Sequence, residues 1–419
     1  MVTDLADEEF EEYYNGFANR VLWPILHYRL DLAEFSRRDL SGYMRVNKRF
    51  ASELHRLLSP DDLIWIHDYH LIPLAGELRK LGHCNRIGYF HHTPFPPPEI
   101  LIALPNHERL VPSMCYYDLV GFHTDHDAAN FARYLKTECG LPSSDSWTFR
   151  IADRTVCIGV FPIGVETAIL HRLARRTVNS PFVREVIDSL AGRMMIIGVD
   201  RLDYSKGIGL RMEAFNHFLT TNPDWRGRVT YLQITPTSRS EVREYAVMAR
   251  QISEMVGQIN GKYGEASWTP IRYVNRAYGR STLAGLYRSA RAALVTPLRD
   301  GMNLVAKEYV AAQDSADPGV LILSRFAGAA VECKAALLVN PFDCEAVGAA
   351  MRDALSMSLD ERRARHAVLF QVLTARDARS WGDTFLSALA EPAAAVRGRP
   401  VRRPSGRSSI HVQSTTRAN

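Results

Sequence analysis

The 419-residue sequence is long enough for two domains, and its 46% of hydrophobic residues can fill sizeable cores. Its formal net charge of +5 depends on the C-terminal end, because residues 392–419 hold six arginines and no acidic residue. Subtracting these six charges leaves the rest of the chain at −1. A body so close to neutral excludes a general attraction to nucleic acid, which we do not expect as a partner.

The six cysteines form no C-x-x-C pair and show no metal-ligand spacing, which favours free thiols in a reducing compartment. No uninterrupted apolar stretch approaches the roughly 20 residues that span a bilayer. The start of the chain is acidic, with Asp4, Asp7, Glu8 and Glu9, unlike a signal peptide. These features predict a soluble cytoplasmic protein without a membrane partner. They leave open whether it is a monomer or a homo-oligomer.

In chain order, the first predicted element is an amphipathic helix over residues 7–22, where aromatic residues recur at helical spacing behind an acidic first turn. Pro24 is expected to end this helix. Apolar runs of strand length follow at 63–66, 86–90, 119–122 and 156–161, with helices predicted between them, among others at 72–81 and 125–136. Continuous apolar runs of this length are typical of buried parallel strands.

A second series of strands is predicted at 194–199, 229–234, 271–274, 292–295, 320–323 and 336–339. Two such alternations predict an α/β protein with two doubly wound domains. We expect the first domain at 1–165, the second at 166–376, a helix at 377–391 that returns to the first domain, and a disordered basic tail at 392–419. In such sheets ligands bind beyond the carboxyl ends of the strands, so the residues there are the candidate site.

The loop after Val199 has the sequence DRLDYSKG and carries two cations, Arg201 and Lys206, before a predicted helix. A planar guanidinium, a compact ammonium and a glycine that allows close backbone approach suit a diphosphate. The loop is neither a Walker loop nor a G-x-G-x-x-G motif. By itself it is equally compatible with two solvated surface cations.

The segment 296–308, TPLRDGMNLVAKE, follows another predicted strand. Asn303 can cap the next helix, whose first amides and positive dipole end favour a phosphate. Glu308 lies about one turn further on, where a carboxylate can accept from the two hydroxyls of a ribose, and Asp300 can hold a sugar hydroxyl. The structural alternative is a capped helix with an ion-paired acid.

Three predicted strands of the first domain end in polar residues, at 67–70, 91–96 and 123–125. Their histidines suggest a metal centre, but the spacings match no metal signature, so no metal is expected. Asp68 and His92 suit sugar hydroxyls better, and the other histidines suit structural roles. Arg239, in the PTSR segment after a strand of the second domain, adds a cation for a second anion site.

Several of these segments closely resemble the trehalose-6-phosphate synthase family: YYNGFANRVLWPILHYR, WIHDYHLIPLAGELRK, the HHTPFP run, VDRLDYSKG, PTSR, QINGKYG and TPLRDGMNLVAKEYVAAQ. The resemblance covers about residues 8 to 390. It implies a GT-B fold, in which two Rossmann-like domains face a cleft. It also implies a retaining glucosyltransferase that joins glucose from UDP-glucose to glucose 6-phosphate, with no cofactor and no metal.

The resemblance also implies roles for individual residues. The catalytic set would be Arg201, Lys206, Asp300 and His92. These four would also bind the donor, together with Gly301, Met302, Asn303, Leu304 and Glu308. The acceptor would contact Tyr14, Trp23, Asp68 and Arg239, with Arg239 on its phosphate. Glucose would be transferred with retention and without a covalent enzyme intermediate, while the cations stabilise the charge that grows on UDP.

The sequence departs from the family pattern at its start. Family members begin with a strand and a loop that contains Gly-Gly, followed by a tryptophan of the acceptor site, whereas this sequence starts at the helix after them and has no Gly-Gly. We therefore expect an incomplete N-terminal domain, which lacks an acceptor-phosphate arginine. Two alternatives stay open: transfer to another phosphorylated acceptor such as glycerol 3-phosphate, and a truncated paralogue that binds nucleotide sugars or regulates without catalysis.

Overall fold

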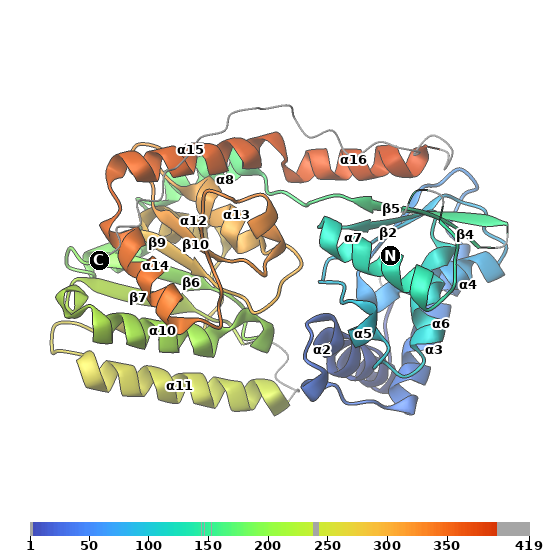
Figure 1. The fold of residues 1–419 in the computed structure, drawn as a ribbon, viewed down its shortest axis with the longest axis horizontal. Helices are drawn as coiled ribbons and strands as arrows, with labels where there is room; N and C mark the ends of the chain where they lie inside the picture. The colour runs from blue at the N-terminus through green and yellow to red at the C-terminus, as the bar shows by residue number, and fades with distance from the viewer. Residues whose placement is uncertain (1–2, 144, 146, 152, 238–242, 392–419) are drawn as a thin grey trace.

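The computed structural model describes residues 3–143, 145, 147–151, 153–237 and 243–391. These residues form two α/β lobes, each built around its own sheet (Figure 1). The prediction of two Rossmann-like doubly wound domains is confirmed. The predicted basic tail at 392–419 lies outside the described residues.

The first sheet has the strand order β1-β2-β3-β5-β4. Its strands are β1 (Ile64–His67), β2 (Ile87–Phe90), β3 (Leu119–Phe122), β4 (Thr148–Ile151) and β5 (Arg154–Val160). The first three and β5 are parallel and nearly continuously apolar, as predicted. The sequence analysis missed β4, which pairs antiparallel with β5. Its mixed TFRI sequence follows from its place at the sheet edge, where one side needs no apolar cover.

The first helical segment runs further than predicted. It consists of α1 (Asp7–Phe10), the π-helix η1 (Glu11–Leu22) and α2 (Trp23–Leu26). The expectation that Pro24 ends the helix is wrong, because the backbone stays helical from η1 into α2, which includes Pro24 and ends at Leu26. The φ that the proline ring imposes is compatible with a helical backbone. The other helices of this lobe are α3 (Arg37–His55), α4 (Leu74–Lys80), α5 (Pro98–Leu101), α6 (His107–Leu110) and α7 (Asp125–Thr137).

The second sheet is entirely parallel, with the strand order β11-β10-β9-β6-β7-β8. Its strands are β6 (Met194–Val199), β7 (Val229–Ile234), β8 (Ile271–Val274), β9 (Ala292–Val295), β10 (Val320–Ser324) and β11 (Leu337–Val339). The chain builds outward from β6 to β8 and then returns to place β9 beside β6. The strand order therefore reverses between β6 and β9, which is where doubly wound sheets bind ligands.

Helices cover both faces of the second sheet (Figure 1). They are α8 (Thr167–Thr177), α9 (Pro181–Asp188), α10 (Ile208–Thr221), α11 (Arg243–Tyr263), α12 (Arg280–Ser289), α13 (Leu304–Ala312), α14 (Cys344–Ser356) and α15 (Leu359–Ala375). Within the described part of the chain, no helix is both long and apolar enough to cross a membrane.

The last helix, α16 (Ala378–Ala390), leaves the second lobe and packs on the first sheet (Figure 1). Phe385 and Leu389 are fully buried there against Phe90 and Phe161. Glycine at position 88 makes room for them, since a Cβ would stand 2.8 Å from the Phe385 ring. The helix therefore completes the core of the first lobe although it follows the second in sequence.

We predict that Phe385→Ala lowers the free energy of unfolding of the first lobe by about 3–5 kcal/mol, because it leaves a cavity between α16 and the sheet. Urea denaturation followed by tryptophan fluorescence measures this loss. Phe35→Ala is the matched control in the same lobe, since Phe35 is 49% exposed, and should cost less than about 1 kcal/mol. Equal losses in the two variants would contradict the role of α16.

Candidate active site

The loop after β6 is folded around Asp203, whose Oδ1 accepts from the Ser205 amide at 2.9 Å. Gly207 then begins α10 with φ +65°. A Cβ at Gly207 would lie 2.7 Å from the Thr296 carbonyl oxygen, so the loop after β6 packs directly on the end of β9. This packing brings Arg201 and Lys206 to the point where the strand order reverses.

Arg211 of α10 holds this region together, and the sequence analysis missed it. Its side chain is fully buried and donates to Asp200 Oδ2 at 2.6 Å, Thr296 Oγ1 at 3.0 Å and the Lys206 carbonyl at 3.1 Å. Burial opposes its charge, but the Asp200 carboxylate raises the pKa of Arg211 above its ordinary value. An arginine within the apolar stretch IGLRM at the start of α10 was the available signal.

Lys206 and Asp300 form an ion pair across the two loops, with Nζ 2.5 Å from Oδ2. The same Oδ2 accepts from Asn303 Nδ2 at 3.0 Å. Burial works against the charge of Lys206, yet Asp300, Asp203 and Asp200 together raise its pKa. Lys206 therefore stays cationic at neutral pH.

Asn303 caps α13 as predicted, since its Oδ1 accepts from the Ala306 amide at 3.2 Å. Its φ of +73° turns the chain sharply into the helix. The first amides of α13 have no partner within the helix, so they offer donors beside Lys206. Gly301, Met302 and Leu304 lie in the same turn, with Leu304 exposed.

The two lobes touch at His92, which follows β2. A Cβ on Gly301 would lie 2.0 Å from the His92 carbonyl oxygen, so the backbones of the two predicted donor segments meet there. His92 Nε2 is 3.0 Å from His67 Nδ1, and Asp68 Oδ1 accepts from the His92 amide at 3.3 Å. Burial and the neighbouring His67 lower the pKa of His92 to about 4, so this imidazole is neutral at pH 7.

Asp68 turns the chain sharply at the end of β1, with φ +70°. Its carboxylate accepts from its neighbour's amide as well as from His92. In the described part of the chain, no group of three or more His, Cys, Asp or Glu side chains is arranged to hold a metal ion.

Trp23 faces the second lobe, with the Arg201 guanidinium carbon 5.2 Å from its ring centroid. The buried His27 ring lies 4.0 Å from Trp23, and its Nδ1 donates to the Trp23 carbonyl at 2.8 Å. Burial lowers the pKa of His27 to about 4, although the charges of Asp203 and Asp300 act in the opposite direction. A neutral histidine thus supports the indole on which Arg201 rests.

Two predicted residues lie further out, and one is outside the described residues. Tyr14 stacks on His70 at 5.5 Å between ring centroids. Glu308 stands on α13, where burial raises its pKa. Among the described residues, neither side chain makes a hydrogen bond or ion pair with the Arg201 loop. Arg239 falls within 238–242 and is not described.

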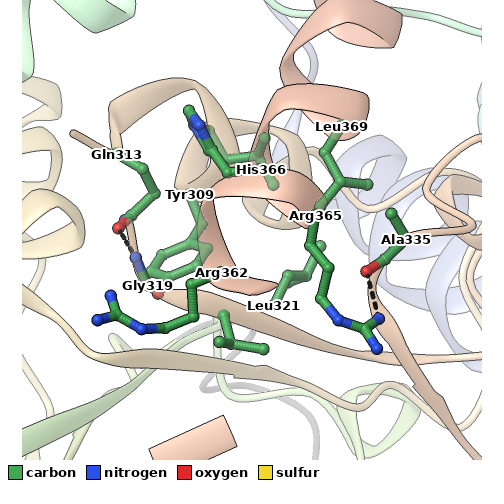
Figure 2. Close-up of a pocket in the computed structure, with 11 residues that line it drawn as sticks. Tyr309, Gln313, Gly319, Leu321, Ala335, Arg362, Arg365, His366 and Leu369 are labelled. Carbon is green, nitrogen blue, oxygen red and sulfur yellow. Dashed lines mark hydrogen bonds between the residues drawn. The ribbon is translucent and has the colours of Figure 1, made fainter. Parts of the chain in front are cut away.

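The cavity in Figure 2 lies away from these groups, between α13, α15 and β10. Figure 2 shows Gln313 accepting from the Gly319 amide and Arg365 donating to the Ala335 carbonyl across its rim. Its volume of about 10 Å³ suits a single water molecule and is far below that of a nucleotide sugar. The candidate site therefore remains the junction of the two lobes.

A comparison with known families decides the class of protein to which this junction belongs. Residues 1–391 match the model of the family described as Glycosyltransferase family 20. The chain belongs to glycosyltransferase family 20.

Individual family 20 proteins are similar along most of their length. A trehalose-6-phosphate synthase of Sinorhizobium fredii (strain NBRC 101917 / NGR234) is 53% identical over 388 residues, which are 93% of this chain and 84% of that protein. A synthase from Burkholderia xenovorans in complex with glucose-6-phosphate is 45% identical with a TM-score of 0.90, covering 92% of this chain and 87% of that chain. The E. coli synthase bound with UDP-2-fluoro glucose is 46% identical with a TM-score of 0.89, covering 92% and 85%.

Two further contacts between the lobes of this family 20 chain also escaped the sequence analysis. Arg299 lies 3.9 Å from the Tyr28 ring centroid, and Arg29 lies 5.5 Å from that of Tyr204. Tyr28 adopts φ +64°, which is rare for a residue with a side chain. Cations and aromatic rings far apart in sequence give no periodic signal, so only the fold pairs them.

We predict that the free energy of unfolding decreases as the pH is lowered from about 6.5 to 4. Burial holds the pKa of His91 at about 3 and those of His27 and His92 at about 4, whereas the unfolded chain binds these protons below about 6.5. The unfolded state then carries more protons, so acid favours it.

The test replaces His91, which takes up one of the protons that only the unfolded chain binds in this pH range. His91→Phe should reduce the slope of unfolding free energy against pH by about 1.4 kcal/mol per unit near pH 5, measured by urea titrations from pH 7 to 4.5. Tyr89→Phe is the control, because it removes only the hydroxyl that contacts His91 Nδ1 at 3.1 Å. An unchanged slope for His91→Phe would disprove the assignment.

Proposed function

We propose that this chain transfers glucose from UDP-glucose to glucose 6-phosphate with retention of configuration, releasing UDP and trehalose 6-phosphate. The observation that carries the proposal is the group formed by Arg201, Lys206 and the first turn of α13 at the strand-order reversal, facing Trp23 and His92 of the other lobe. The family 20 relatives that bind glucose-6-phosphate and a UDP-glucose analogue support the choice of substrates.

The donor would lie at the junction of the β6 and β9 loops. Arg201 and Lys206 would bind the diphosphate, and the turn from Gly301 to Leu304 would add amide donors from the start of α13. Lys206 is paired with Asp300. Diphosphate binding would draw Lys206 away and free the Asp300 carboxylate for a hydroxyl of the donor glucose.

Three further donor and acceptor roles follow from position and charge. His92 is neutral and would share a hydrogen bond with the donor glucose. Glu308 would accept from the ribose, and Asp68, beside His92, would bind the acceptor sugar. Tyr14 and Trp23 would line the acceptor pocket, with Arg239 on the acceptor phosphate.

We propose that the transfer proceeds without a covalent intermediate. When the bond between glucose and phosphate breaks, the sugar becomes oxocarbenium-like and the leaving UDP gains negative charge. Arg201, Lys206 and the α13 amides would stabilise that charge more strongly in the transition state than in the ground state. The acceptor hydroxyl would attack from the same face and pass its proton to the departing phosphate oxygen.

The proposal includes no metal ion, because Arg201, Lys206 and the helix terminus supply the positive charge. It places the protein in the cytoplasm, since the six cysteines are free thiols, as expected in a reducing compartment. We also propose 1–165 and 166–376 as the domain limits, with 377–391 as a returning helix. The 165/166 limit falls between β5 and α8.

We predict that Arg201→Ala lowers kcat for UDP release in the presence of glucose 6-phosphate by about 100-fold to 1,000-fold, because one donor to the leaving group is lost. A coupled assay for UDP measures this, with and without a chelator, which should change nothing. Arg184→Ala is the control, since Arg184 is exposed on α9 and bonds Asn179. Unchanged turnover in Arg201→Ala would refute the diphosphate assignment.

For Arg239→Ala we predict a KM for glucose 6-phosphate raised by about tenfold or more with little change in kcat, because the residue would bind the acceptor phosphate only. Initial rates at varied acceptor concentration measure both constants. Faster UDP release with glycerol 3-phosphate would favour the alternative acceptor. UDP binding without release for any acceptor would favour the non-catalytic paralogue.

A further inference from the structure

The chain passes between the two lobes twice, and the two connections touch. The first, 161–166, joins β5 to α8, and the second, 376–377, joins α15 to α16 (Figure 1). A Cβ on Gly164 would lie 1.9 Å from the Arg376 carbonyl oxygen, so the two backbones are in direct contact. Trp381 Nε1 also donates to the Phe161 carbonyl at 3.1 Å. Any change in the angle between the lobes must pass through this crossing.

Lys307 attaches α13 to the crossing. It lies one position before Glu308 and is fully buried. Its Nζ donates to the Ile163 carbonyl at 2.7 Å and to Glu332 Oε2 at 2.6 Å. The other carboxylate oxygen, Glu332 Oε1, accepts from Arg376 Nη1 at 2.9 Å. One ion-pair network therefore holds both connections.

Lys307 and Glu332, the two members of the network inside the second lobe, are both connected to the proposed donor site. Lys307 is on α13, whose first turn would bind the diphosphate. Glu332 directly follows the 3-10 helix η7 (Gly328–Val331), which is hydrogen-bonded to the donor loop. The Gly328 amide donates to the Asp300 carbonyl at 3.2 Å, and the Ala329 amide to the Met302 carbonyl at 2.8 Å. A shift of the donor loop is thus transmitted to both ends of the network.

Stability alone does not explain the charges. A buried ion pair is often no more stabilising than apolar side chains of the same volume, whereas removal of one partner is costly. The ion pair instead fixes the orientation of the Lys307 side chain, because Nζ must point at both the Ile163 carbonyl and Glu332. In the first lobe, burial lowers the pKa of His123, and the neighbouring His92 and the charge of Lys307 lower it further.

We propose that Lys307, Glu332 and Arg376 form a hinge clamp. They are positioning residues that couple the angle between the lobes to the position of the donor helix α13. The clamp keeps Arg201 and Lys206 facing the acceptor lobe. Its kinetic consequence rests on the proposed function, whereas its effect on the angle between the lobes does not.

The test combines Lys307→Met with the control Arg288→Met. The Arg288 side chain is only 10% exposed, contacts the C-terminal end of α13 through the Ala312 carbonyl and pairs with Asp314, but it makes no hydrogen bond or ion pair with either connection. Spin labels on Leu57→Cys and Asp224→Cys, with Cys84, Cys139 and Cys344 replaced by serine, report the distance between the lobes. Isothermal titration with UDP reports the donor site, and UDP release reports turnover.

We expect Lys307→Met to broaden the distance distribution and to lower kcat by about tenfold to 100-fold, with the Kd for UDP changed less than about threefold. The control variant should leave the distance distribution, kcat and the Kd for UDP close to their wild-type values. An unchanged distance distribution, or a Kd for UDP that weakens in step with kcat, would overturn the proposal. If wild type releases no UDP with glucose 6-phosphate, the proposed function fails while the distance measurement still decides the clamp.

Two further variants separate the clamp from a folding defect. Arg376→Met removes the partly exposed member of the network, and Gly164→Ala forces the connections apart without changing a charge. Both should broaden the same distance distribution and lower kcat, and Arg376→Met should do so while unfolding at a temperature close to wild type. If both keep the wild-type distribution, the crossing does not set the angle between the lobes.

Discussion

The buried guanidinium of Arg211 organises the second lobe at the point where its strand order reverses. It joins Asp200 after β6, Thr296 after β9 and the carbonyl of Lys206. Two loops that are almost 100 residues apart therefore meet at fixed positions. Because the positive charge is buried, its partners cannot be lost without a large cost in solvation, and this rigidity places Lys206 beside Asp300.

The charged groups of the candidate site are partnered with one another. Lys206 pairs with Asp300, and Arg201 rests on Trp23 beside Asp203. In the proposed function, a diphosphate would replace these partners with a stronger one, so its binding would be coupled to the release of a carboxylate and an indole on the two lobes. Such an exchange would link donor binding to the formation of the acceptor side.

The lobes meet through backbone as much as through side chains. Gly301 has no room for a Cβ because it faces the His92 carbonyl oxygen of the first lobe, and Gly328, within the second lobe, packs in the same way on the Gly301 carbonyl oxygen. The glycine in the PLRDGMN segment is thus explained by its contact with the other lobe and not by the conformation of its own loop. The crossing at Gly164 follows the same principle.

The sequence by itself determined the two strand series, the cap of α13 by Asn303 and the cations after β6, because apolar runs, capping residues and loop charges are local patterns. It misplaced the end of the first helix and missed β4 and the roles of Arg211 and Lys307. Those features depend on which strands become neighbours and on which charges share a buried space. Only tertiary packing decides these, because the cost of burying a charge makes its partner matter more than its place in the sequence.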